Sequence, residues 1–355
     1  MNKATYTVDV PGDRFDVLEV IVEHEKPLKL MLVGGVDSGK TTLLTFLVNS
    51  LVERGLDVAV VDSDVGQKGI LPPATISLAF PSGKVSTVSD LEPFAHYFIG
   101  TTSPAQYVGE MAIGVKKLAD LAFGQADVVL VDTTGFVTGE GIDMKRLKAE
   151  LLRPDFTIVL ERSGEMGGLK RILSPYTRVL TLSVSDRVRP HSPEERRLIR
   201  AAKWGEYFSG AGTVDVDLRE VVPTGTELFH GSPLGVEEKG LLESVFGWVV
   251  FAGWKGRGYV VVKADSGKLP RHFNRSALHA VDFEKLSNLL VGFIDESGLC
   301  LGLGILKWLN FHEMKAQVLT PLSDEDLSES VEMRFGRIRL LESGEELGLL
   351  RREEI

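Results

Sequence analysis

Short and almost uninterrupted apolar runs mark the first half of the chain. They occupy residues 28–33, 58–61, 128–131, 156–160 and 177–182. Continuous apolar runs of this length are typical of parallel strands that are buried on both faces of a sheet. Two stretches between them, 42–53 and 106–122, carry apolar residues at helical spacing. Strands that alternate with helices predict an α/β fold with a mostly parallel sheet.

The two ends of the chain have a different pattern. Residues 1–27 alternate weakly, with Tyr6, Val8 and Val10 followed by an apolar group at 17–22, and we expect a short β segment there. After residue 212, β-type runs follow one another at 214–222, 248–254, 259–264, 289–295, 300–310 and 315–320. Glycine-containing segments at 253–258 and 295–298 separate pairs of these runs and predict hairpins. The expected parts are therefore a β segment over 1–27, an α/β domain over 28–212 and a smaller β-rich domain over 213–355.

Composition narrows the classes of protein. The 355 residues hold 40 Lys and Arg against 50 Asp and Glu, a net charge of −10, which argues against a general positive surface for duplex DNA. The single cysteine, Cys300, excludes an intrachain disulfide and a cysteine-based metal site. Residues 1–10 have no apolar core, so we expect no signal peptide, and no apolar stretch in the sequence reaches membrane-spanning length. We expect a cytoplasmic protein without membrane contact; the oligomeric state stays open.

A phosphate-binding motif follows the first apolar run. The sequence GGVDSGKT over residues 34–41 matches G-x-x-x-x-G-K-[ST], between a predicted strand and a predicted helix. Its backbone N–H groups and the positive end of the helix favour phosphate, in contrast to an accidental glycine-rich turn. Lys40 is expected to reach the β- and γ-phosphates, and the Thr41 hydroxyl to bind Mg²⁺. The expected nucleotide-binding residues are Gly34, Gly35, Val36, Asp37, Ser38, Gly39, Lys40, Thr41 and Thr42.

Acidic residues end the next two strands of the predicted sheet. Asp62 and Asp64 follow the run at 58–61, and Asp132 follows the run at 128–131. The carboxyl ends of parallel strands face the crevice where ligands bind, so these carboxylates are expected beside the phosphate motif. The alternative is that each aspartate only caps a turn.

The phosphate motif leaves the reaction open. Residues 132–135 match the D-x-x-G element of GTPases, but no N-K-x-D or T-K-x-D element for guanine follows. A partitioning ATPase would carry a second lysine where this chain has Gly35. A kinase needs positive charge for the transferred phosphoryl group, and residues 187–203 hold six Lys and Arg against two Glu. Arg196 and Arg197 are each spaced to share a helical face with Arg200, although a solvated helix face would look the same.

Five segments in order resemble the polynucleotide 5′-hydroxyl-kinase family, in particular a short, archaeal-type member. They are GGVDSGKT (34–41), DSDVGQ (62–67), GTTSP (100–104), DTTGFVTGEG (132–141) and RRLIRAAKWGEYFSG (196–210). Eukaryotic members of this family include a subunit of the pre-mRNA cleavage complex and a pre-rRNA processing kinase. The resemblance covers residues 28–210 and implies a P-loop kinase domain. It also implies transfer of the γ-phosphate of ATP, or another NTP, to the 5′-hydroxyl of RNA, with DNA as a further acceptor.

The resemblance also implies roles for single residues. Lys40 is catalytic and Thr41 binds the metal. Asp64 is the base that activates the acceptor, with Gln67 beside it, while Thr101 and Thr102 clasp the substrate. Phe136 stands where the family carries an aromatic residue, often Trp, that stacks on the terminal base; a core phenylalanine is the alternative. Arg197 and Arg200 belong to a lid over the phosphates.

The expected metal set is Thr41 with Asp62 and Asp64, and the division of base and metal roles among Asp62, Asp64 and Asp132 stays open. The expected partners are a nucleotide and the 5′ end of an RNA, which needs only local neutralisation and so agrees with a net charge of −10. The competing hypotheses are a P-loop GTPase or ATPase switch that acts on a protein or RNA partner, and a structural subunit that binds nucleotide without turnover. Residues 213–355 match the family weakly and carry no inferred activity.

Overall fold

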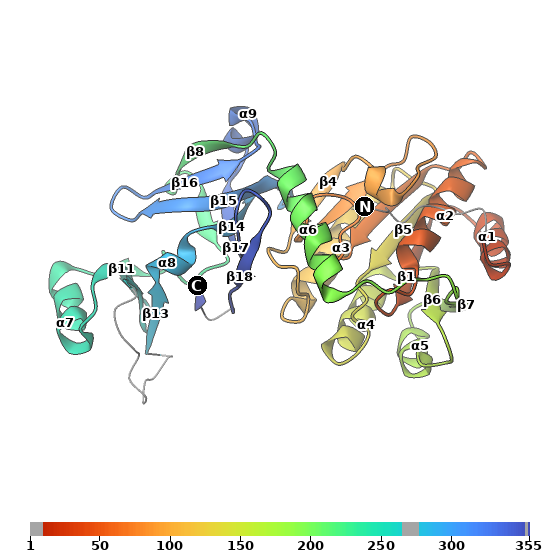
Figure 1. The fold of residues 1–355 in the computed structure, drawn as a ribbon, viewed down its shortest axis with the longest axis horizontal. Helices are drawn as coiled ribbons and strands as arrows, with labels where there is room; N and C mark the ends of the chain where they lie inside the picture. The colour runs from red at the N-terminus through yellow and green to blue at the C-terminus, as the bar shows by residue number, and fades with distance from the viewer. Residues whose placement is uncertain (1–9, 265–276, 352–353) are drawn as a thin grey trace. The chain divides into compact units, whose positions relative to one another are not determined.

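The computed structural model describes residues 10–264, 277–351 and 354–355. The chain divides into two compact units, one up to Lys203 and one from Trp204 onward. The division falls inside helix α6 (Pro193–Tyr207), nine residues before the end of the domain that the sequence analysis bounded at 212. Figure 1 shows the ribbon and labels many of its helices and strands.

The first unit is built on a seven-stranded sheet with the order β4-β3-β2-β5-β1-β6-β7. Its parallel part contains the five predicted strands, in sequence order β1 (Leu28–Gly34), β2 (Val58–Ser63), β5 (Val128–Thr133), β6 (Phe156–Glu161) and β7 (Arg178–Ser183). The α/β class with a mostly parallel sheet is therefore confirmed. Two short strands, β3 (Thr75–Ala79) and β4 (Ala95–Phe98), extend the sheet in antiparallel fashion and were not predicted.

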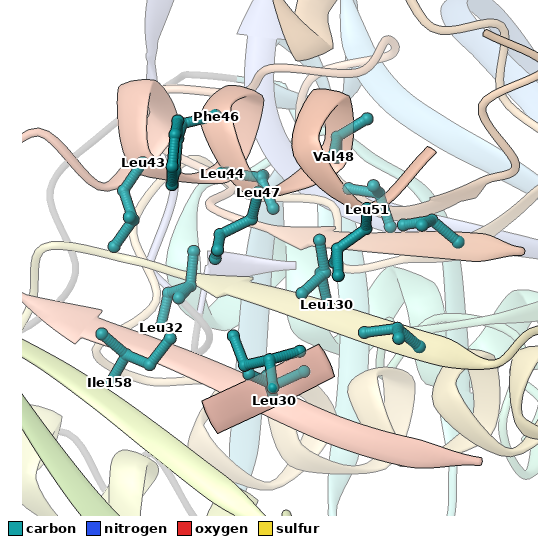
Figure 2. Packing of buried hydrophobic residues seen from close by; sticks show 14 of the residues in the cluster. Leu30, Leu32, Leu43, Leu44, Phe46, Leu47, Val48, Leu51, Leu130 and Ile158 are labelled. Carbon is teal, nitrogen blue, oxygen red and sulfur yellow. The ribbon is translucent and has the colours of Figure 1, made fainter. Parts of the chain in front are cut away.

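Helices cover this sheet. In chain order they are α1 (Asp13–Glu23), α2 (Lys40–Val52), the short η1 (Val88–Asp90), α3 (Val108–Phe123), α4 (Glu140–Leu152), α5 (Gly167–Leu173) and α6. Figure 2 shows α2 above the sheet, with Leu44 and Leu47 of the helix facing Leu32, Leu130 and Ile158 of the strands. Because α2 packs on the sheet in this way, its first turn lies near the end of β1. No helix among the described residues is long and apolar enough to cross a membrane.

The prediction of a β segment over residues 1–27 was wrong for residues 13–23, which the structure describes as a helix. Residues 13–23 form α1, which buries Arg14, Val17, Leu18 and Ile21. These positions recur at three- and four-residue spacing, the period of a helix, and the β-branched residues between them gave the impression of alternation. Tyr6 and Val8 lie outside the described residues.

The second unit is β-rich, as the β-type runs predicted, and its described residues form two sheets. The larger has the order β18-β17-β14-β15-β16-β8, with β9 paired to β17, and the smaller has the order β10-β11-β12-β13. The larger sheet holds β8 (Gly212–Asp217), β9 (Val222–Thr224), β14 (Leu289–Ile294), β15 (Cys300–Asn310), β16 (Lys315–Thr320), β17 (Glu332–Leu340) and β18 (Glu346–Leu349). The smaller holds β10 (Ser232–Pro233), β11 (Val250–Lys255), β12 (Tyr259–Lys263) and β13 (Leu278–Asp282).

Both predicted hairpins are present, since β11 pairs with β12 and β14 with β15 in antiparallel fashion. The prediction of one strand over 214–222 was wrong, because a turn after Asp217 separates β8 from β9. Among the described residues of this unit, three short helices accompany the sheets: α7 (Val236–Phe246), α8 (Phe283–Leu286) and α9 (Asp324–Ser328).

Candidate active site

The phosphate-binding loop turns sharply between β1 and α2. Gly39 has a φ of +85°, a left-handed conformation that favours glycine, and α2 begins with the next residue. The loop after β5 packs directly on this turn, because a Cβ added at Gly135 would lie 2.7 Å from the backbone nitrogen of Val36. The Ser38 hydroxyl is buried and finds no hydrogen-bond partner among the described residues. A ligand oxygen that enters the loop would supply that partner.

The side chain of Lys40 bends back and contacts the phosphate-binding loop. Its Nζ donates hydrogen bonds to the carbonyl oxygens of Gly34 at 3.0 Å and Gly35 at 2.8 Å. The same ammonium interacts electrostatically with the carboxylate of Asp132, which is buried at the end of β5. That carboxylate accepts a hydrogen bond from the Thr133 N–H at 2.8 Å. Burial raises the pKa of Asp132 to about 7, against the lowering effect of Lys40. The lysine and this carboxylate therefore belong to one electrostatic site.

The loop after β2 is organised by Asp62. Its Oδ1 accepts from the N–H of Asp64 at 3.0 Å, and its Oδ2 accepts from those of Gly69 at 2.7 Å and Ile70 at 2.8 Å. Lys68 Nζ lies 3.4 Å from the same Oδ2. These contacts tie the carboxylate of Asp62 to its own loop and favour a structural role over metal binding.

Asp64 is arranged differently, because β2 has ended at Ser63. Its Oδ1 accepts from the N–H groups of Gly66 at 3.1 Å and Gln67 at 3.0 Å. Its Oδ2 has no hydrogen bond to any described residue, and the side chain is half-buried. One oxygen therefore fixes the carboxylate in place, while the other remains open to a ligand.

Buried lysines surround these carboxylates, and the sequence analysis missed them. Lys145 and Lys148 project from α4 and are fully buried. Lys145 Nζ donates to the carbonyl oxygen of Thr134 at 2.8 Å and to its hydroxyl at 2.9 Å. Lys148 Nζ donates to the Ser63 hydroxyl at 2.8 Å, which in turn donates to the carbonyl oxygen of Asp132 at 2.6 Å. The two lysines thus connect α4 to the ends of β2 and β5.

Burial sets the protonation of these amines. It lowers the pKa of Lys148 to about 7 and that of Lys145 well below its ordinary value, although Asp64 and Asp132 act in the opposite direction on both. Burial also lowers the pKa of Lys68, against the effect of Asp62. The strand ends therefore hold several lysines whose charge depends on the protonation of neighbouring aspartates.

The predicted clasp residues lie beside the loop of Asp64. A Cβ added at Gly66 would lie 3.2 Å from the carbonyl oxygen of Thr102, so the two loops pack closely. Thr101 is fully buried, and its Oγ1 accepts from the N–H of Ser103 at 3.1 Å. Thr102 is half-buried and Gln67 is exposed. The loop that carries Gln67 thus packs against the segment of Thr102 at Gly66, while Thr101 bonds within its own turn.

Phe136 follows the loop that touches the phosphate motif. The side chain is half-buried and is not among the buried hydrophobic residues of the described chain. The first turn of α4 approaches it closely, because a Cβ at Gly141 would lie 2.9 Å from Phe136 Cγ. A partly exposed ring held against a helix agrees with a stacking surface better than with a core position.

The basic segment forms helix α6, as the spacing of its arginines predicted, and it is anchored twice within the first unit. Arg196 Nη1 donates to Asp37 Oδ2 of the phosphate loop at 3.2 Å, and the N–H of His191 donates to the same oxygen at 3.2 Å. Lys203 Nζ donates to the carbonyl oxygens of Lys68 and Gly69. Arg196 was not among the expected site residues, and its signal was the four-residue spacing to Arg200.

Arg197 and Arg200 occupy the stretch between these two anchors. Arg197 is exposed and Arg200 is half-buried. Both take part in further polar interactions, so neither is a free cation.

The donors around the loop suit a magnesium–nucleotide complex. The described residues contain no group of three or more His, Cys, Asp or Glu side chains that could hold a metal ion. Mg²⁺ in such sites uses one or two protein oxygens together with phosphate oxygens and water, so no such group is required. Thr41 at the first turn of α2, the second oxygen of Asp64, and Asp132 are suitable donors.

A parallel sheet with a G-x-x-x-x-G-K-T loop between β1 and α2, and with aspartates at the ends of β2 and β5, defines a P-loop nucleotide-binding protein. Comparison with known proteins narrows this class. Residues 34–210 match the family model described as "mRNA cleavage and polyadenylation factor CLP1 P-loop". A polyribonucleotide 5′-hydroxyl-kinase of Thermococcus kodakarensis is 59% identical over 355 residues, which cover 100% of both chains.

A second relative of the same name, from Methanocaldococcus jannaschii, is 48% identical over 100% of this chain and 99% of its own. Among solved structures, the wild-type Clp1p–Pcf11p complex matches with a TM-score of 0.61 and 14% identity, over 92% of this chain and 77% of that chain. The structural match supports the fold, and the full-length identities decide the family. The chain belongs to the polyribonucleotide 5′-hydroxyl-kinase family.

Proposed function

We propose that this protein is a Mg²⁺-dependent kinase that transfers the γ-phosphate of ATP to the 5′-hydroxyl of RNA. The observation that carries the proposal is the position of Asp64. It lies at the carboxyl end of β2, one oxygen held by two backbone N–H groups and the other open, and it acts electrostatically on the same buried Asp132 as the P-loop Lys40. A base fixed beside a phosphate-binding loop is what the attack of a hydroxyl on a γ-phosphate requires.

In this reaction the 5′-hydroxyl oxygen forms a bond to the γ-phosphorus, and the bond from that phosphorus to the β–γ bridging oxygen breaks. The proton of the hydroxyl passes to Asp64, and the electron pair of the broken bond stays on the ADP oxygen. Lys40 compensates negative charge on the phosphates. Mg²⁺ held by Thr41 and Asp132 would neutralise phosphate charge, because the open oxygen of Asp64 serves as the base. The backbone contacts of Asp62 favour leaving it outside this set.

Acceptor recognition is assigned to the surface beside this centre. Phe136 would stack on the terminal base without reading its identity, because every base has a π-face. Gln67, Thr101 and Thr102 line or support the loops that meet at Gly66. The lid is α6, in which Arg200 and Arg197 would approach the phosphates while Arg196 holds Asp37.

The test is incubation of the purified protein with γ-labelled ATP and a 5′-hydroxyl oligoribonucleotide, followed by separation of oligonucleotide from free phosphate. The same oligonucleotide with a 5′-phosphate is the matched control and should take up no label. A DNA oligonucleotide of the same sequence reports whether DNA is an acceptor. Label in free phosphate alone would support a nucleotide-hydrolysing switch, and the absence of any turnover would support a structural subunit; both results contradict the kinase.

A further inference from the structure

The second unit exposes aromatic rings beside a cavity. Of the four tryptophans, Trp204, Trp248 and Trp254 are 0%, 4% and 6% exposed, whereas Trp308 on β15 is 56% exposed. Phe251 on β11 is exposed as well. Leaving a large indole in water forgoes the burial that stabilises the other three.

The ring of Phe283 packs against both exposed rings, Phe251 and Trp308. Phe283 of α8 contacts Phe251 at a centroid distance of 5.0 Å and Trp308 at 5.1 Å, the latter in a T-shaped arrangement at 78°. Phe283 also packs against Phe311, which contacts the buried Trp254. The exposed indole is therefore fixed to the core of the unit through a chain of rings, which is the property of a preformed platform and not of a loose surface side chain.

Beside this platform lies a cavity of about 320 Å³, lined by Phe283 and Trp308 together with two cations, Lys307 and Arg339. The pairing of β15 with β16 shifts register between Leu306 and Trp308, so that Lys307 occupies a bulge next to the indole. The bulge places a positive charge and an exposed ring side by side on one strand. A regular strand would have directed these neighbours to opposite faces.

The charges of this cavity are predominantly positive. Lys307 makes no hydrogen bond or ion pair with any described residue. Arg339 donates to the carbonyl oxygens of Ser287 and Glu284, each at 3.0 Å, so its charge is fixed in position without being neutralised by a carboxylate. Among the described residues, the exposed carboxylate of Glu284 is the one acidic group in the lining. Two cations and one anion beside the rings of Phe283 and Trp308 favour a ligand that is anionic and has a planar ring.

We propose that this aromatic–cationic cavity binds a nucleotide of the RNA acceptor beyond its 5′ end, with the base on Trp308 and a backbone phosphate between Lys307 and Arg339. Aromatic platforms flanked by cations are how proteins hold single strands without reading sequence. The proposal rests on the proposed function in one respect, that RNA is the acceptor. It adds a second point of contact, on residues to which no activity has been assigned.

Trp308 provides its own signal, because the other three tryptophans are buried. The experiment titrates the full-length protein, without ATP, with 5′-hydroxyl oligouridylates of 2, 6, 12 and 20 nucleotides and follows tryptophan fluorescence. We expect quenching that strengthens with length and weakens with salt. Trp308→Phe should abolish the signal while retaining RNA affinity, because phenylalanine also stacks. Absence of quenching at every length would overturn the proposal.

Kinetics then separate this site from the catalytic centre. Trp308→Ala should raise the KM of the 20-mer roughly 5–150-fold, the effect of one lost stacking contact, and leave kcat and the KM of the dinucleotide unchanged. Lys307→Gln should act in the same direction and reduce the salt dependence. Leu241→Ala, at a residue of α7 that is likewise exposed, is the matched control and should change neither KM.

The outcomes distinguish this inference from the kinase proposal. A protein that binds the 20-mer through Trp308 but phosphorylates no oligonucleotide would refute the kinase alone. Phosphorylation of the 20-mer by Trp308→Ala with an unchanged KM would refute the cavity alone. If light scattering shows wild-type self-association that Trp308→Ala abolishes, with RNA affinity unaltered, the surface is a protein interface and the proposal is wrong.

Discussion

Lys148→Met tests the arrangement of charge around the strand ends. The wild-type amine is fully buried, donates to Ser63 Oγ, and has a pKa lowered to about 7 by burial. Methionine nearly preserves the volume and removes the amine, while the Ser63 hydroxyl can still donate to the carbonyl oxygen of Asp132. The charged groups that face Lys148 are Asp64, Asp132, Asp62, Lys68 and Lys145.

The sign of the effect follows from proton binding in the two states. Between pH 7 and 10.5 the unfolded chain carries a proton on Lys148 that the folded protein lacks. Because the unfolded state then binds more protons, the free energy of unfolding rises with pH across this window. Around pH 7 the slope falls off as the folded protein takes up the proton, and well below pH 7 both states carry it and this lysine gives no slope. The limiting slope for one proton is about 1.4 kcal/mol per pH unit.

From pH 7 to pH 9 the wild type should therefore gain about 2 kcal/mol of stability relative to Lys148→Met, because titration is half complete at pH 7. For a unit of this size that is roughly 4–8 °C in Tm. Thermal unfolding of both proteins at several pH values measures it. Taking the difference removes the contributions of titratable groups that do not interact with Lys148, since these are the same in both proteins.

The matched control is Lys84→Met, at an exposed lysine of the same unit, which should keep the wild-type slope. A difference between wild type and Lys148→Met that stays constant from pH 7 to pH 9 would refute the reasoning. It would mean that Lys148 remains charged in the folded protein, as one member of an ion-pair network with Asp64 and Asp132.

Three further predictions concern the proposed kinase centre. Lys40→Ala should lower transfer by at least about 10²-fold with an unchanged Tm, and wild-type transfer by the folded variant would contradict the P-loop assignment. Asp64→Asn should keep nucleotide affinity and lower kcat roughly 10²–10⁴-fold; a loss of affinity at unchanged kcat would instead make Asp64 a metal ligand and Asp132 the candidate base. Phe136→Ala should raise the acceptor KM roughly 5–150-fold and leave the ATP KM unchanged, whereas Phe136→Trp should retain acceptor binding. A core role would instead lower the Tm of both Phe136 variants and leave the acceptor KM unchanged.

The parallel strands and the phosphate loop could be predicted from sequence because each depends on a local signal. Strands such as β1 and β5 are buried on both faces and are therefore almost wholly apolar. The loop itself requires the glycines at 34 and 39, because a Cβ at Gly34 would lie 2.5 Å from Ser38 Oγ and Gly39 has a φ of +85°. Strand β17 was missed because it carries Arg334, Arg337 and Arg339 among its apolar residues, and only pairing with β14 makes such a sequence a strand.

The sequence pattern of α4 already held a signal for the buried lysines, which the sequence analysis did not use. On α4 the buried positions are 141, 144, 145, 148, 149 and 152, a stripe with helical spacing. Lys145 and Lys148 stand in this stripe, among Met144, Ala149 and Leu152. A charge in the middle of an apolar stripe indicates a buried polar partner, but the sequence does not say that the partners are Thr134 and Ser63. Those partners come from strand ends that only the fold brings to the helix.

Helix α6 distinguishes the two lid arginines, Arg197 and Arg200, that the sequence analysis treated alike. Arg196 and Lys203 are seven residues apart and so lie on one face, and each anchors that face to a loop of the site. Arg200 is four residues from Arg196 and shares this face, whereas Arg197 is rotated from it by about 100°. Their exposure agrees, because Arg200 is half-buried and Arg197 is exposed. If α6 keeps this face toward the nucleotide, Arg200 is the better placed of the two to neutralise the transferred phosphoryl group, and Arg196 controls that placement through Asp37.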